Sequence, residues 1–359
     1  MWLLFTSPLL AGYFFAATIS LLVSGVAVAG EQVAEVEPLA AAFVATASSN
    51  PTVTTPLASE ESTVLLTEQQ RLERELLLMV AALDEQSYQG TLTYEFGGPL
   101  ETLAFEHLVG SSGTQERIRH LSGYQRFFSR HLPHEHCNNA AMRLFTQQGQ
   151  NPLGHLENYY VFRALGQNRF ADRRVNMVQI LPKDQYRFGF TLGIDSETHL
   201  PLMVALMGPR GEMLERFQFI QMAAVAPSND SSAASMAGAQ ALAYADSNCE
   251  QPMVESGWQP QWLPDGFVLA SIDDSAHKTV MSYTDGLASL SVFVVPIAEA
   301  SGAVGVVQRG ATVVAMLLAA QNQKSYKVSV VGEVPAGVAR RVASSVIYVN
   351  DKAEAVTHE

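Results

Sequence analysis

Apolar side chains recur at every second position in one segment of this chain after another, and this alternation constrains the fold more than any other feature. Residues 88–96 carry the alternation, Gly97 and Gly98 follow, and residues 101–109 return with the same period. Further segments with this period lie at 115–121, 125–130, 159–164, 176–182, 186–194, 200–207 and 213–222. A period of two is typical of strands with one buried face, and short connections favour antiparallel neighbours. The first half of the chain is therefore predicted to form a meandering antiparallel sheet.

A single helical pattern precedes these strands. Thr67 and Gln70 form a capping-box pattern, which satisfies two free backbone donors at the start of a helix. The apolar residues that follow at helical spacing are Leu72, Leu76, Met79, Val80 and Leu83. We expect one amphipathic helix that ends near Glu85.

The length of the chain predicts two domains. A chain of 359 residues is too long for one ordinary core. We place a first domain at 67–222, an Ala- and Ser-rich linker at 223–256 and a smaller α+β domain at 257–350. In the second domain, residues 313–321 are expected as a helix, residues 327–331 as a strand and residues 335–346 as a closing helix.

The beginning of the chain predicts export. Residues 1–29 carry no charged side chain and end in an Ala-Val-Ala cleavage pattern, so we interpret them as a signal peptide. The usual positive residues at the start are missing, which leaves a retained membrane anchor as the alternative. Residues 30–66 are rich in small and polar residues and are expected to form a disordered tether. The net charge of −13 argues against nucleic acid as a partner.

The second domain contains the clearest hairpin pattern. Asp285 and Gly286 favour a type I′ turn, in which both central residues take positive φ. The residues that follow alternate again, and Pro296 ends the strand.

This hairpin, at residues 282–296, resembles the signature of the RseB/MucB family. The resemblance extends to further stretches in the same order along the chain: 88–94, 100–103, 181–190, 194–202, 258–267 and 328–335. It implies a lipoprotein-carrier-like first domain, an open antiparallel β-barrel around a helical plug, followed by a smaller α+β domain. The expected fold class is mainly β with some α.

The resemblance also implies a function. Members of this family are periplasmic regulators that bind the periplasmic segment of a single-span anti-sigma factor and shield it from proteolysis. The second domain would supply the main contacts, and the first would sense the acyl chains of lipopolysaccharide or lipoprotein, whose binding releases the partner. The alternative is a periplasmic lipid or lipoprotein carrier without an anti-sigma partner. The sequence does not decide whether the protein forms a homo-oligomer.

Large apolar residues on the expected strands of the first sheet are the candidates for a lipid pocket. They are Leu92, Tyr94, Phe105, Tyr186, Phe188, Phe190, Phe217 and Phe219. A strongly curved sheet with one helix can leave a concave apolar site for a ligand. The alternative is an ordinary core packed against the helix.

Aromatic residues and the hairpin of the second domain are the candidates for partner binding. They are Trp258, Trp262, Phe267, Tyr283, Asp285 and Gly286. Aromatic side chains are favoured anchors at protein interfaces. The same residues also suit the core of a small domain.

The two cysteines, Cys137 and Cys249, are predicted to form a disulfide, because an exported chain meets an oxidising compartment. Two free thiols are the alternative. The cluster of His131, His134, Glu135, His136 and Cys137 contains metal-binding residue types, but Pro133 and the strand geometry separate them. We expect a polar loop there and no metal.

The sequence gives no support to an enzyme. Ser275 and Lys278 match an S-x-x-K pattern, but the companion elements of that catalytic class are missing. No nucleophile elbow, phosphate loop or dinucleotide fingerprint is present in the sequence. We therefore expect a binding protein without a cofactor. A secreted hydrolase that uses Ser275 or His134 is a third, weaker hypothesis.

Overall fold

The computed structural model describes residues 67–111, 113–133, 153–225, 256–275, 278–298, 304–321 and 323–349. Most of these residues lie in strands, which form a nine-stranded sheet, a six-stranded sheet and a two-stranded ladder. Within these ranges, no helix has the length and apolar character needed to cross a bilayer. The expected leader, the tether and most of the linker lie outside the described residues.

Helix α2 (Glu68–Glu85) begins where the capping-box pattern predicts. The Gln70 N–H donates to Thr67 Oγ1 at 3.2 Å, and the Thr67 N–H donates to Gln70 Oε1 at 2.9 Å. The buried side of the helix consists of Leu72, Leu76, Met79, Ala82 and Leu83. The capping box therefore fixes where α2 begins, and its one apolar stripe fixes which side is buried. A shorter helix, α4 (Gly154–Glu157), precedes strand β5.

The first sheet is open and antiparallel, with the strand order β4-β3-β2-β1-β9-β8-β7-β6-β5. Its strands are β1 (Tyr88–Phe96), β2 (Leu100–Gly110), β3 (Gly113–His120), β4 (Phe127–Pro133), β5 (Tyr160–Phe170), β6 (Arg173–Pro182), β7 (Gly189–Asp195), β8 (Pro201–Met207) and β9 (Met213–Ala224). The strands predicted from the alternation are confirmed, although several ends move by a few residues. The pairing of β1 with β9 joins two meanders and leaves β4 and β5 as the edges.

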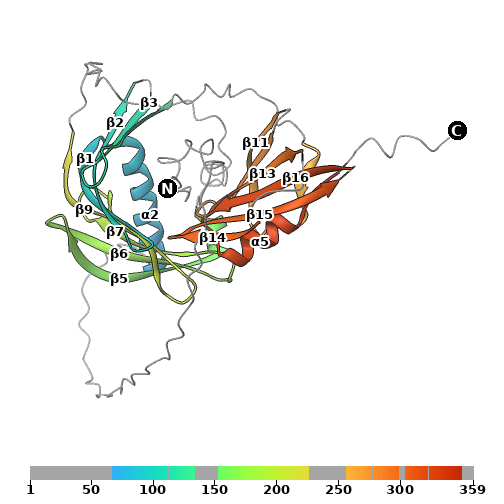
Figure 1. Cartoon of the computed structure of the whole chain (residues 1–359). Coiled ribbons are helices and arrows are strands. Elements are labelled where there is room, and N and C mark those ends of the chain that lie inside the picture. Colours follow the sequence, from blue (N-terminus) through green and yellow to red (C-terminus); the bar gives the residue numbers. More distant parts are fainter. Residues whose placement is uncertain are drawn as a thin grey trace, which may run out of the picture.

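The nine-stranded sheet curves around α2, as Figure 1 shows. The apolar side chains of its inner face and those of the helix form one core, which includes Leu76, Tyr94 and Phe190. Two residues of the second sheet's loops, Leu287 and Ala311, also belong to this core. The first core is thus completed by the other half of the chain.

The second sheet has the order β11-β12-β13-β16-β15-β14. Its strands are β11 (Val268–Ser275), β12 (Lys278–Thr284), β13 (Ser289–Ile297), β14 (Gly305–Arg309), β15 (Thr312–Gln321) and β16 (Lys324–Gly332). The predicted β12–β13 hairpin is confirmed. Its turn differs from type I′, because only Gly286 takes a positive φ, of 104°, and the loop spans four residues, 285–288.

The helix predicted at residues 313–321 is wrong, because this segment is strand β15. Its Ala, Met and Leu residues favour helices, and this composition suggested the wrong element. In the structure β15 pairs along its length with β16 on one side and with β14 on the other, and Val313 and Ala315 are buried. Pairing with two neighbours decides such ambiguous segments.

The closing helix is confirmed as α5 (Ala336–Ser344), which follows Pro335. Val338 and Val342, one turn apart, are buried against β15 and β16. The short strands β10 (Trp258–Pro260) and β17 (Val346–Tyr348) pair beside this helix. The second sheet, α5 and this ladder enclose a separate core.

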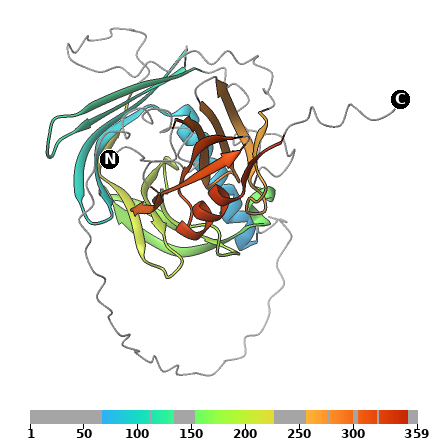
Figure 2. The same cartoon turned by 45° about the vertical axis from the view of Figure 1, so that its right-hand side comes forward.

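The predicted fold class, mainly β with some α, is confirmed. A curved sheet around a helical plug is followed by a smaller α+β unit, and both views place the second sheet beside the side of the first sheet that holds α2 (Figures 1 and 2). The two units therefore meet at the open side of the curved sheet.

Replacement of Leu76 by Ala tests whether α2 is the plug of the first core. Leu76 is only 1% exposed, so its truncation leaves a cavity, and a loss of about 2–5 kcal/mol in unfolding free energy is expected. Urea unfolding followed by circular dichroism measures it. Arg74→Ala on the exposed side of the same helix is the control, expected within about 0.5 kcal/mol of the wild type. Equal losses for both variants would contradict a buried plug.

Candidate functional site

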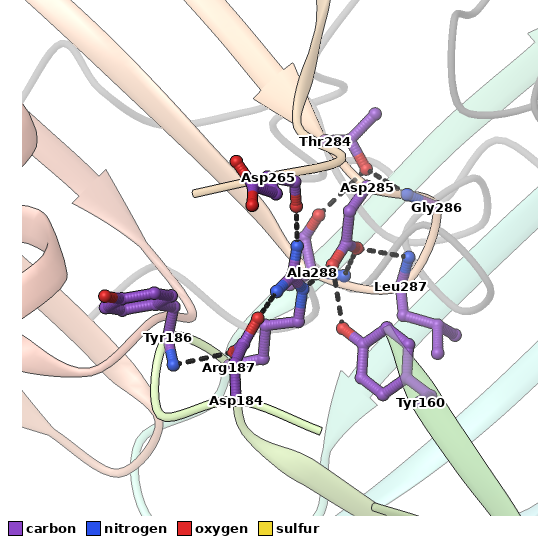
Figure 3. Close-up of polar contacts among 10 residues, drawn as sticks. All are labelled: Tyr160, Asp184, Tyr186, Arg187, Asp265, Thr284, Asp285, Gly286, Leu287 and Ala288. Atoms are coloured by element: carbon purple, nitrogen blue, oxygen red, sulfur yellow. Dashed lines mark hydrogen bonds and ion pairs between the residues drawn. The ribbon is translucent and has the colours of Figure 1, made fainter. Parts of the chain in front are cut away.

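Three segments that lie far apart in the chain meet at one buried point between the two sheets (Figure 3). The turn before β7 carries Asp184 and Arg187, the segment before β11 carries Asp265, and the β12–β13 loop carries Asp285. Each of the three belongs to a stretch that stood out in the sequence. Tyr160, the first residue of β5, joins them through its hydroxyl, and we refer to Tyr160, Asp184, Arg187, Asp265 and Asp285 as the arginine junction.

The Asp285 side chain organises its own loop. Its Oδ1 accepts the N–H groups of Leu287 at 2.9 Å and of Ala288 at 2.7 Å. The neighbouring Thr284 hydroxyl accepts the Gly286 N–H at 3.0 Å and donates to the Ala288 carbonyl at 2.8 Å. A short polar side chain that bonds to the backbone two or three residues on is the usual way to fix such a turn.

The other oxygen of Asp285 faces the first domain. Its Oδ2 accepts the Tyr160 hydroxyl at 2.9 Å and Arg187 Nε at 2.5 Å. Both residues of the Arg187–Asp285 ion pair have side chains that are 0% exposed. With four hydrogen bonds, the carboxylate has no further direction open for a ligand or a metal. Asp285 therefore joins the two domains.

Arg187 is the hub of the arginine junction. Its Nη1 donates to the Asp184 carboxylate and its Nη2 to the Asp265 carbonyl. The guanidinium carbon lies 4.7 Å from the ring centroid of Tyr159 and 5.4 Å from that of Phe267. A planar cation can accept such stacking and still use its in-plane donors. The guanidinium group of Arg187 thus contacts residues of both domains, with aromatic rings against its faces and hydrogen-bond acceptors at its edge.

The electrostatics follow from the burial of this pair. Burial acts to lower the pKa of Arg187, but the charge of Asp285 and the hydrogen bond to it outweigh burial, so the pKa is raised above its usual value. Burial, together with the charge of Asp285, raises the pKa of Tyr160 well above its usual value. Arg187 therefore stays charged and Tyr160 stays a hydrogen-bond donor at ordinary pH.

The two domains also approach closely beside the junction. Gly266 has a φ of 87°, and a Cβ at this position would lie 2.4 Å from a ring carbon of Tyr159. Only glycine fits both the backbone angle and the space. The Asp265-Gly266-Phe267 turn therefore needs its glycine for contact with the first domain.

The predicted partner-binding residues are mostly buried. Trp258, Phe267, Tyr283, Asp285 and Gly286 are buried, and three of them (Trp258, Phe267 and Tyr283) belong to the second core. Burial also raises the pKa of Tyr283 to about 12.

Trp262 differs, because it is half-buried. Its ring centroid lies 3.8 Å from the guanidinium carbon of Arg341 and 5.5 Å from the ring of Tyr186. The structure therefore brings one predicted partner-binding residue to the surface near the boundary between the domains.

Seven of the eight predicted lipid-pocket residues lie together in the first core: Leu92, Tyr94, Phe105, Phe188, Phe190, Phe217 and Phe219. The eighth, Tyr186, packs against the second core instead. Burial of the seven fits both an ordinary core and a wall shared with a ligand. The lipid pocket stays a prediction.

Other predicted sites lie outside the described residues. Cys137 and Cys249, His134 and His136 are among them, as are two positions of the S-x-x-K pattern. In the part of the chain that the structure describes, no group of three or more His, Cys, Asp or Glu side chains is placed to hold a metal ion.

Four residues of the arginine junction were not predicted from the sequence: Tyr160, Asp184, Arg187 and Asp265. The available signal was the position of Arg187, three residues after Asp184 and directly before an apolar strand. An Arg that is buried in such a place needs a partner for its charge. Its partner lies 98 positions further on, beyond the reach of any local pattern.

Sequence models of known families match both halves of the chain. The model of the MucB/RseB N-terminal domain matches residues 71–237, and that of the MucB/RseB C-terminal domain matches residues 252–347. The two matches together cover more than half of the chain.

Individual proteins match as well. The sigma factor AlgU regulatory protein MucB of Pseudomonas aeruginosa is 34% identical over 283 residues, which are 74% of this chain and 88% of MucB. The sigma-E factor regulatory protein RseB of Escherichia coli is 29% identical over 204 residues, which are 53% of this chain and 60% of RseB. The crystal structure of MucB in complex with MucA(peri) has a TM-score of 0.59 and 31% identity, and the match covers 78% of this chain and 99% of that one.

Replacement of Asp285 by Asn tests the arginine junction. The amide keeps the size of the side chain but leaves Arg187 without its fully buried counter-charge, so a loss of about 3–5 kcal/mol in unfolding free energy is expected. Asp184→Asn is the control and costs less, because the Asp184 side chain is 27% exposed. Urea unfolding of Asp285→Asn, Arg187→Met and the double variant gives the coupling between the two residues. Additive losses would contradict a direct pair.

Proposed function

The chain belongs to the MucB/RseB family, and from this premise we propose that it is a periplasmic negative regulator of an envelope-stress sigma factor pathway. It binds the periplasmic segment of a single-span anti-sigma factor and protects that segment from proteolysis. The observation that carries the proposal is the match of both family domains in order, together with the solved complex of MucB with MucA(peri).

The proposal assigns a role to each part of the chain. Residues 1–29 direct export and 30–66 form a tether. Residues 67–222 form the sensor domain, 223–256 the linker and 257–350 the domain that binds the anti-sigma segment. Apart from Leu287 and Ala311, the buried members of the first core lie within 67–222 and those of the second core within 257–350, which supports the division into two domains.

The arginine junction supports binding by both domains as a unit. An extended segment that crosses from one domain to the other needs them in a fixed orientation, since binding to a preorganised surface avoids the entropy of ordering it. Arg187 and Asp285 hold that orientation with a pair whose geometry is directional.

Trp262 is the residue that we assign to partner contact. Its ring contacts both Arg341 and Tyr186, so an incoming side chain meets a fixed aromatic and cationic surface near the domain boundary. Aromatic and Arg side chains dominate the binding energy of many interfaces.

Release by lipid is the second part of the proposal. The acyl chains of lipopolysaccharide or of a lipoprotein would enter the first domain among the aromatic residues between the sheet and α2. By linkage, such a ligand releases the partner only if it binds the free protein more tightly than the complex.

The alternative is a lipid carrier without an anti-sigma partner. A carrier needs only the first domain, and it gives no reason for the second sheet or for a buried ion pair that fixes it to the first. The relatives are regulatory proteins by name, which also disfavours the carrier and the hydrolase.

Truncation of Trp262 tests the partner surface. Trp262→Ala is expected to weaken binding of the anti-sigma segment at least about tenfold, because an aromatic anchor is lost. Fluorescence anisotropy with a labelled segment measures the affinity. Tyr124→Ala, at a residue that is 92% exposed in the first domain, is the matched control and should bind like the wild type. Removal of residues 253–359 should abolish binding, and unchanged affinity after that truncation would refute the assignment.

Competition by lipid tests the sensor role. Purified lipopolysaccharide added to the preformed complex is expected to lower the apparent affinity in proportion to its concentration, because the two ligands bind the protein in a mutually exclusive way. The same titration with a deacylated sugar core is the control. An affinity that lipopolysaccharide does not change would leave the anti-sigma role standing and remove the sensor role.

A further inference from the structure

A second buried polar junction joins the two domains, and the function proposed above does not use it. It centres on Glu215 of β9, which is only 4% exposed. Glu215 Oε2 accepts the Tyr94 hydroxyl at 2.7 Å, and Oε1 accepts the Ala311 N–H at 2.9 Å. Ala311 lies in the β14–β15 turn of the second sheet, so the carboxyl group bonds across the domain boundary.

A second carboxyl group is buried at the same place. Glu333, 3% exposed, directly follows β16. In the β15–β16 ladder Val313 is opposite Gly332, which places Glu333 beside Thr312 and next to the turn that Glu215 contacts. Both carboxyl groups are buried, and the charge of Glu333 acts on Glu215, so one buried carboxyl group from each domain lies at this boundary.

The two domains approach so closely at this junction that no Cβ fits between them. A Cβ at Gly310 would lie 2.4 Å from Glu215 Oε1, and a Cβ at Gly97 would lie 3.0 Å from the Gly310 nitrogen. Both glycines take positive φ. The two domains thus touch through glycines on both sides, and the carboxyl group of Glu215 is pressed against the turn.

In the described part of the chain, the titratable groups that act on Glu215 are acids. The titratable groups around it are Tyr94 on β1 and Glu333 after β16, and Glu101 on β2 acts on Tyr94 in turn. Arg309 of β14 lies nearby, with its guanidinium carbon 4.5 Å from the ring of Phe96. Burial first, and the charge of Glu333 second, raise the pKa of Glu215 from 4.5 to about 8, and they outweigh the hydrogen bonds from Tyr94, Ala311 and Thr312, which act to lower it.

We propose that the carboxyl pair of Glu215 and Glu333 makes the docking of the two domains dependent on pH. The domains are held together at this junction while the pair carries a proton, and the junction opens when both carboxyl groups are charged. Two carboxylates cannot both ionise in a buried site without strong repulsion. The arginine junction carries permanent charges and keeps its contacts, so the motion is an opening at one end of the interface.

The direction of the effect follows from linkage. The docked form binds a proton more tightly than the open form, whose Glu215 has its usual pKa. Docking is therefore strongest in acid, and weakens as pH rises from about 4.5 to about 8. Above that pH neither form holds the proton and the dependence ends.

Hydrogen exchange of the Ala311 amide tests this directly, because this N–H donates to Glu215. In the full exported chain without any partner, mass spectrometry measures the protection of a peptide that covers the β14–β15 turn, after correction for the intrinsic rate. Protection is expected to fall by up to about tenfold per pH unit between about pH 4.5 and pH 8, and to level off above pH 8. Amides of α2 serve as the internal reference.

Two variants separate the proposal from a purely structural role. Glu215→Gln keeps the size and an acceptor oxygen but cannot ionise, so the dependence on pH should be lost. Glu333→Gln removes the repelling charge, so levelling off should begin at a lower pH. The same slope in the wild type and in Glu215→Gln, or a wild-type protection that does not change between pH 5 and 9, would overturn the proposal. None of these outcomes depends on anti-sigma binding, so this test and the proposed function can fail separately.

Discussion

The buried pair of Arg187 and Asp285 is the interaction on which the arrangement of the molecule depends. Each sheet has its own core, and apolar packing between them is non-directional, so it defines their relative orientation only loosely. The pair fixes that orientation by direction as well as by charge, because the guanidinium has to meet two carboxylates, a carbonyl and two aromatic faces at once. Burial makes the loss of either partner costly.

The two junctions differ in how they respond to the environment. The arginine junction is an ion pair between groups that stay charged, and it sets a permanent orientation. The junction at Glu215 brings two acids together, and by the proposal above it holds only while the pair carries a proton. A regulator that binds an extended segment across two domains gains from such a division, since one contact preserves the binding geometry and the other allows it to change.

The sequence predicted the parts that depend on local patterns. The capping box at Thr67 located α2, and the alternation of apolar residues located the strands of the first sheet. Residues 313–321 were wrongly assigned to a helix, because their composition outweighed pairing that only the fold reveals. Asp285 was correctly placed in the turn of the β12–β13 hairpin, because local residues define that turn. Its bond to Arg187 spans 98 positions and was not predicted. Long-range pairing of buried charges leaves no periodic signal.

Calorimetric titration of the full exported chain with the exported segment of its cognate anti-sigma factor tests the central claim most directly. The account predicts single-site binding with a dissociation constant of about 1 µM or tighter. Absence of heat at two well-separated temperatures, which excludes a chance cancellation of enthalpy, would contradict it.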